Sequence, residues 1–104
     1  MFLSRSLLLT ACTLLFLFNY AMAEEAESRA RRLMNALGCK ACHSFEQSGS
    51  IIAPALTRIG ARLSLEQLEE KLTLHQDNNS LMPSYETTPA EDLKAILIFL
   101  SERK

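Results

Sequence analysis

The chain has almost no excess of charge of either sign. Its 104 residues carry 11 lysines and arginines against 12 aspartates and glutamates, which gives a net charge of −1. Without a basic excess there is no argument for a nucleic-acid partner, and without an acidic excess there is none for a disordered acidic tail. The length allows one small domain and excludes a two-domain enzyme with a cofactor fold of its own.

The sequence also lacks internal repeats, low-complexity tracts and segments in which apolar and polar residues alternate. Alternation with a period of two is the pattern of a half-buried strand, so we expect no sheet. Apolar residues recur at helical spacing instead, which predicts an all-α domain with three main helices. The first helix is expected over residues 25–37, the second follows Ser64 and the third begins at Pro89. Residues 44–55 and 75–87 are predicted to be loops, and residues 55–60 a short helical turn.

Local signals mark where these helices begin and end. Gly38 is well placed to end the first helix. Ser64 and Gln67 have the spacing of a capping box at the start of the second. Thr88 is expected to cap the third helix, with Pro89 as its first residue. We expect the buried stripe of this helix to consist of Leu93, Ile96, Leu97 and Leu100, widened by Ile98 and Phe99.

The first 23 residues have the composition of a secretory signal peptide. Arg5 precedes an apolar run from Leu7 to Phe18, which is shorter than the roughly 20 residues of a membrane span. The small residues of Ala21-Met22-Ala23 suit cleavage by a signal peptidase, which would leave a mature domain of residues 24–104. Two alternatives stay open: an uncleaved anchor that reaches Ala23, and a lipoprotein in which Cys12 is lipidated.

The segment Cys39-Lys40-Ala41-Cys42-His43 has the C-x-x-C-H form that attaches a c-type haem. Two thiols at this spacing on a helical turn can each add to one vinyl group of the same porphyrin. The adjacent His43 can then present its imidazole to the iron from one face. One covalently bound haem c would also supply part of the core that so short a domain lacks.

Three other interpretations use the same residues. A disulfide between Cys39 and Cys42 leaves His43 without a role. A thioredoxin-like redox pair requires a βαβ setting, for which the sequence has no signal. A zinc site requires four ligands, and His75 is available as the fourth, but the adjacent Cys42 and His43 fit one tetrahedron poorly.

The mature chain resembles the small monohaem class I cytochromes c of bacteria over nearly its whole length. The features that carry the resemblance are, in chain order, the first helix with Ala30 and Met34 before Gly38-Cys39, the C-x-x-C-H motif, Ala53-Pro54-Ala55-Leu56, Leu81-Met82-Pro83-Ser84-Tyr85, and a last helix that starts at Thr88-Pro89 and carries Phe99. The chain departs from the family at Met34, which replaces an aromatic residue, and at Ala53, which replaces a glycine.

The resemblance implies a cytochrome c fold, in which three main helices surround one haem and the first and last helices pack together. It implies His43 and Met82 as the two axial iron ligands, with Pro83 stiffening the loop that holds Met82. Pro54 is implied as the acceptor of the His43 Nδ1 proton. Tyr85 is expected either to reach a haem propionate or to be a half-buried loop aromatic. His75 is the competing axial ligand, and a solvated helix-end histidine is its alternative role.

Two strong axial ligands leave no open position on the iron, so the resemblance implies a periplasmic one-electron carrier rather than an enzyme. Its partners would be a redox protein donor and acceptor, and the chain itself would be a monomer or part of a transient complex. It would contact a membrane only through a retained or lipidated N-terminal segment. The alternatives are a haem subunit of a larger periplasmic oxidoreductase, which an exposed apolar patch beyond the haem edge would favour, and a haem-based sensor. Lys40, Arg58 and Arg62 either guide an acidic partner or are ordinary solvated charges.

Overall fold

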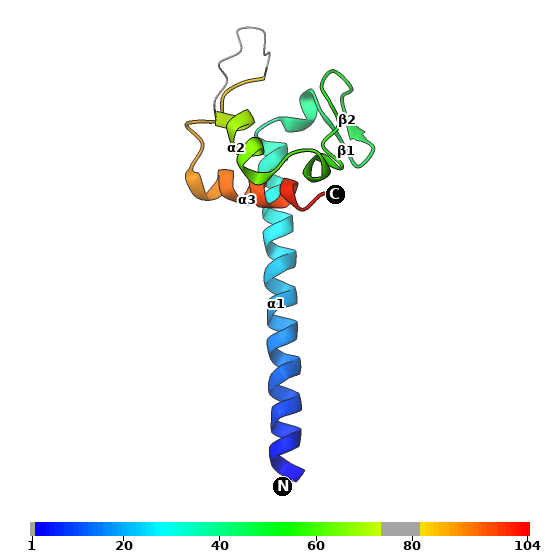
Figure 1. Cartoon of the computed structure of the whole chain (residues 1–104), viewed down its shortest axis with the longest axis vertical. Coiled ribbons are helices and arrows are strands. Elements are labelled where there is room, and N and C mark those ends of the chain that lie inside the picture. The colour runs from blue at the N-terminus through cyan, green and yellow to red at the C-terminus, as the bar shows by residue number, and fades with distance from the viewer. Residues whose placement is uncertain (1, 74–81) are drawn as a thin grey trace.

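A computed structural model describes residues 2–73 and 82–104 of the chain. This part contains three α-helices, α1 (Phe2–Ala36), α2 (Leu65–Thr73) and α3 (Ala90–Ser101), and two short 3-10 helices, η1 (Cys39–Ala41) and η2 (Ile59–Ala61). The first part of α1 projects from a small head that contains the other described elements (Figure 1). The prediction of a mostly helical small domain with three helices is confirmed.

The prediction that the chain forms no sheet is wrong. Strands β1 (Ser44–Phe45) and β2 (Ser48–Gly49) form a small antiparallel hairpin. Its two turn residues, Glu46 and Gln47, have positive φ angles of 48° and 67°. This turn normally carries Asn-Gly, because both central positions adopt left-handed backbone angles. The sequence shows no such signal, and strands of two residues are too short to show alternation.

We expect Gln47→Gly to stabilise the protein by about 0.5–1 kcal/mol, because glycine adopts the left-handed region without the Cβ penalty. Urea unfolding measures the change. The control is Gln47→Ala, which keeps a Cβ and should unfold close to the wild-type midpoint. An equal gain in both variants would show that the backbone angle is not the cause.

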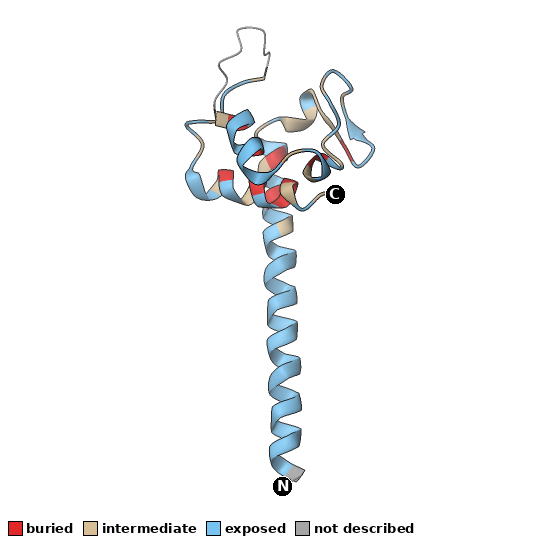
Figure 2. Ribbon diagram, in the orientation of Figure 1, coloured by how far each residue is buried: buried red, intermediate tan, exposed pale blue. Residues whose placement is uncertain are grey.

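The core lies where α3 crosses the end of α1 (Figure 2). On α1, Ala30 and Met34 have exposed fractions of 0% and 1%, as expected for the helix that packs against the last one. The α3 residues Leu93, Ile96, Leu97, Phe99 and Leu100 are buried as predicted. Ile98 does not widen the stripe, since it falls on the opposite side of the helix and is exposed.

Helix capping follows the sequence in α2 but not in α3. The Ser64 amide donates to Gln67 Oε1 at 2.9 Å, and the Gln67 amide donates to Ser64 Oγ at 3.2 Å, so the capping box is present. Leu65, at the start of α2, has the i, i+3, i+7 spacing of the buried Leu68 and Leu72 but remains 36% exposed. Helix α3 has Pro89 as its N-cap, without a side-chain cap, so the prediction of Thr88 as N-cap is wrong. The Thr88 amide instead donates to the Tyr85 carbonyl at 3.0 Å, which closes the preceding turn.

Gly60 lets η2 lie directly against the end of α3. Its amide donates to the carbonyl of Arg103 at 2.8 Å. A Cβ at this position would overlap the backbone carbonyl of Ser101 and lie 2.8 Å from the carbonyl oxygen of Leu100. The helical turn predicted over residues 55–60 therefore lies a few residues further along the chain, as η2, where the glycine permits the close approach.

We expect Gly60→Ala to lower the free energy of unfolding by roughly 3 kcal/mol, because two backbone segments must separate to admit one methyl group. Thermal or urea unfolding measures the loss. Gly38→Ala is the matched control, since no atom lies within 4 Å of its added Cβ and only its left-handed φ of 77° is strained. That control should lose about 1 kcal/mol. Equal losses in the two variants would contradict the close-packing argument.

Ion pairs join α1, the hairpin and the C-terminal residues. Arg31 of α1 pairs with Glu27 at 3.0 Å and with Glu46 of the hairpin turn at 2.9 Å. Arg103, beyond α3, pairs with Glu27 at 3.2 Å. The hydrogen bond from Arg31 is the main reason that the pKa values of Glu27 and Glu46 lie below their usual 4.5. Beneath these groups, Phe45 and Phe99 pack with ring centroids 5.7 Å apart.

We expect these two carboxylates to make stability fall at acid pH. A pKa lowered by folding contributes stability above the usual value of 4.5, and this contribution is lost as pH falls through the lower folded value. Melting temperatures measured between pH 6 and pH 3 test this. Glu27→Gln combined with Glu46→Gln should flatten the acid limb, and an unchanged acid limb would contradict the assignment.

The first part of α1 packs against nothing in the described protein. Its apolar side chains, such as Leu7 and Phe16 at 68% and 81% exposed, face outward on all sides. The helix from Leu3 to Ala36 is long and apolar enough to cross a membrane. Such a segment is compatible with a signal sequence or with a membrane anchor.

Candidate functional site

The C-x-x-C-H motif forms a single tight turn directly after α1. Gly38 ends α1 in a left-handed conformation, as predicted, and η1 begins at Cys39. The amides of Cys42 and His43 both donate to the carbonyl of Cys39, which holds the three motif residues on one turn. Both thiols are free and partly exposed. Burial raises the pKa of the Cys39 thiol.

The imidazole of His43 is held by the backbone of the segment that follows the hairpin. Its Nδ1 lies 2.6 Å from the carbonyl oxygen of Pro54. A carbonyl can only accept, so Nδ1 donates its proton, and in the neutral imidazole this tautomer leaves the lone pair on Nε2. The Ala53 amide donates to the Cys42 carbonyl at 2.8 Å and fixes Pro54 in place. The contact expected between Pro54 and His43 is therefore present.

Several apolar side chains at the edge of the core are only partly covered. They pack against the buried cluster but remain accessible to solvent: Leu33, Leu37, Cys39, Leu56, Leu63, Met82 and Tyr85. Four separate segments of the chain contribute to this set. Incompletely covered apolar surface of this kind is what a flat apolar cofactor would cover.

Tyr85 lies close to the motif. Burial, and then the nearby Cys39 and Cys42, raise the pKa of its hydroxyl. The hydroxyl donates to the carbonyl of Leu37 at 3.3 Å, and the Tyr85 amide donates to the carbonyl of Leu72 at 2.9 Å. In the structure Tyr85 is thus a half-buried loop aromatic with a protein partner, and its contact with a haem propionate stays a prediction.

Met82 packs, partly buried, against the same core as Cys39. It begins the second described part of the chain, in a non-helical segment that continues through Pro83 to the turn before α3. The predicted loop 75–87 is non-helical over its described residues 82–87. His75, the competing ligand, lies outside the described residues, as does Leu81. The axial role of Met82 therefore stays a prediction.

The rival interpretations of the motif gain nothing from the fold. Cys39 and Cys42 are not joined by a disulfide. The sheet in the described part of the chain is a two-residue hairpin, which is not the βαβ setting of a thioredoxin-like pair. Within residues 2–73 and 82–104, no three histidine, cysteine or acidic side chains converge as ligands for a metal ion such as zinc.

Sequence reasoning missed Gly49, which positions the site. A Cβ on Gly49 would overlap the backbone carbonyl of His43 and lie 3.2 Å from the Cβ of Lys40. The hairpin can therefore lie against the motif only because this residue is glycine. Its importance becomes visible once the hairpin is known, and the sequence carries no signal for the hairpin.

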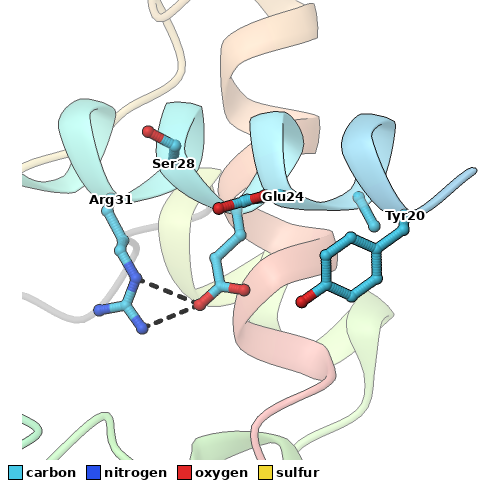
Figure 3. A pocket seen from close by; sticks show the side chains of 6 residues that line it. Tyr20, Glu24, Ser28 and Arg31 are labelled. Atoms are coloured by element: carbon cyan, nitrogen blue, oxygen red, sulfur yellow. Dashed lines mark hydrogen bonds and ion pairs between the residues drawn. The ribbon is translucent and has the colours of Figure 1, made fainter. Parts of the chain in front are cut away.

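A hollow on the side of α1 is not part of this site. It is an open hollow of about 440 Å³ on the side of α1, lined by Tyr20, Ala23, Glu24, Glu27, Ser28 and Arg31. Figure 3 shows Tyr20 and Glu24 at one side of it, and Arg31 bound to a carboxylate at the other. Cleavage after Ala23 would remove two of its lining residues.

Comparison of the chain with protein-family models, with curated proteins and with solved structures finds no match. The function of the site has to be argued from its own chemistry.

Proposed function

We propose that the chain is a monohaem c-type cytochrome of the periplasm that carries one electron at a time between redox proteins. In this proposal the described helices belong to a cytochrome c fold, and Cys39 and Cys42 hold one haem through two thioether bonds. The observation that carries the proposal is the hydrogen bond between His43 Nδ1 and the Pro54 carbonyl. It orients the ring in the tautomer whose neutral form has its lone pair on Nε2, which is the form in which histidine binds iron.

The residues present fit this group. Two free thiols and a preoriented histidine lie on one turn, and partly covered leucines from separate segments pack against the same core as Cys39. A small domain of this kind gains core material from such a cofactor. When bound, a haem supplies an iron that changes between the ferrous and ferric states. His43 and Met82 would fill both axial positions, so that no substrate has a place to bind on the metal.

Each protein group has a distinct task in this function. Pro54 fixes the ring orientation and the tautomer of His43. Met82 provides a soft thioether, which favours the ferrous state relative to a second histidine. The hydrogen bonds that hold η1, the hairpin and residues 53–56 together keep His43 and Pro54 in one arrangement, as a fast electron carrier requires.

We further propose that the chain is exported and that cleavage follows Ala23. The exposed part of α1 supports this, because the first α1 residue with no exposed surface is Ala30, well after the cleavage point. Removal of residues 1–23 would thus leave every buried contact of the head intact.

Expression in a host that matures c-type cytochromes tests the proposed function. We expect a denaturing gel to retain haem staining at the mass of residues 24–104, and voltammetry to show one reversible one-electron couple. A protein that carries no covalent haem under these conditions would contradict the proposal. Carbon monoxide binding to the ferrous protein without denaturant would indicate an open iron position and a sensor instead.

A further inference from the structure

Two adjacent isoleucines form the most exposed apolar surface of the described head. Ile51 and Ile52 are 91% and 74% exposed. Within residues 2–73 and 82–104, every other large apolar side chain with more than half of its surface exposed belongs to the part of α1 before Ala23. Fully exposed isoleucine side chains lose the stabilisation of burial, so such a pair on a small domain indicates a contact surface.

This exposure does not come from a loose loop. The Ser50 amide donates to the Lys40 carbonyl at 3.1 Å, before the pair. The Ala53 amide donates to the Cys42 carbonyl at 2.8 Å, after it. The two isoleucines are therefore fixed between two anchors, and both anchors are residues of the C-x-x-C-H turn.

Basic side chains flank the pair at both ends. Lys40 lies at the Ser50 end, and Arg62 donates from Nη2 to the Ala55 carbonyl at 3.0 Å at the other. Neither lies within ion-pair distance of a described carboxylate, whereas Arg29, Arg31 and Arg103 all form ion pairs. The Lys40 ammonium lies 5.9 Å from the centre of the Phe45 ring and acts on Glu46 at longer range. The sequence has no acidic residue between Glu46 and Glu66, and Glu46 already pairs with Arg31.

We propose that Ile51 and Ile52, with Lys40 and Arg62 beside them, form the surface on which the redox partner docks. The partner would be a redox protein whose electron-exchange site has an apolar centre and an acidic rim. This inference rests on the proposed function, because its position matters through the adjacent haem-attachment turn. Two isoleucines suit a small transient contact, since permanent interfaces bury more than about 2,000 Å² of largely apolar surface.

A gold electrode coated with a mixed monolayer of methyl-terminated and carboxylate-terminated alkanethiols reproduces the two chemistries of this partner. Adsorbed mass and interfacial electron-transfer rate are both measured on the haem-loaded mature protein. We expect Ile51→Ser combined with Ile52→Ser to weaken adsorption at least tenfold, and Lys40→Gln combined with Arg62→Gln to remove most of its salt dependence. The control Ile98→Ser, on α3, should adsorb like the wild type.

Oxidation by hexacyanoferrate(III) in solution separates docking from damage to the site. This small anion has no apolar face, so the isoleucine variant should react at the wild-type rate and keep the wild-type haem spectrum. Wild-type adsorption of that variant would overturn the docking surface and leave the electron carrier standing. A wild-type protein without covalent haem would overturn both proposals, and haem staining distinguishes that result from the first.

Discussion

Replacing both motif cysteines, Cys39→Ser with Cys42→Ser, is expected to abolish covalent attachment of haem. A serine hydroxyl does not add to a vinyl group as a thiol does, so neither thioether can form. The loss should be complete rather than partial, because both attachment points are removed and no other cysteine remains in the proposed mature chain. Haem staining after denaturing electrophoresis and the mass of the intact protein measure the result.

The control for this experiment is Cys12→Ser. Cys12 is exposed in the part of α1 that precedes the proposed cleavage point, so its replacement should leave haem attachment unchanged. Haem staining that survives in the Cys39/Cys42 variant would show that another group holds the cofactor. A loss of export or a change in mass on Cys12→Ser would instead support lipidation at this residue.

Met82→Ala is expected to remove the weak far-red band that sulfur ligation gives the ferric protein. Without the thioether the ferrous state loses its preferred soft ligand, so the reduction potential should fall by on the order of 0.1 V or more. Absorption spectroscopy of the ferric protein and voltammetry measure the two effects.

Met34→Leu is the matched control, because Met34 is a buried core residue with an exposed fraction of 1%. A volume-conserving change there should cost less than about 1.5 kcal/mol and leave the far-red band in place. If the wild type has no such band, or if Met82→Ala keeps it, the axial assignment is wrong. The same measurement on His75→Ala then tests the competing ligand.

The parts of the fold that could be predicted are those set by short-range signals. The capping box at Ser64 and the helix stop at Gly38 depend on a few neighbouring residues, and both are present. The hairpin could not be predicted, because its turn places Glu46 and Gln47 in left-handed conformations that these residues do not favour. Phe45, almost fully buried, went unnoticed for the same reason: its burial depends on the hairpin.

The candidate site divides in a similar way. The spacing of Cys39, Cys42 and His43 is local, and the turn that carries them follows from it. The partner of His43 is distant in sequence, and only the resemblance to a family indicated Pro54. The exposure of Ile51 and Ile52 could not be predicted, because nothing in the sequence distinguishes these isoleucines from the buried apolar residues of α3.

The unbroken course of α1 through residue 23 has a consequence for the mature protein. Cleavage after Ala23 would cut one continuous helix and create a new helix start at Glu24. The exposed amides of a helix start carry a partial positive charge, to which the new α-amino group adds a full one. Glu24, Glu25 and Glu27 would then stand in the first turn, where carboxylates stabilise a helix. The acidic residues that follow the proposed signal segment are thus already in place to stabilise the start of the shortened helix after cleavage.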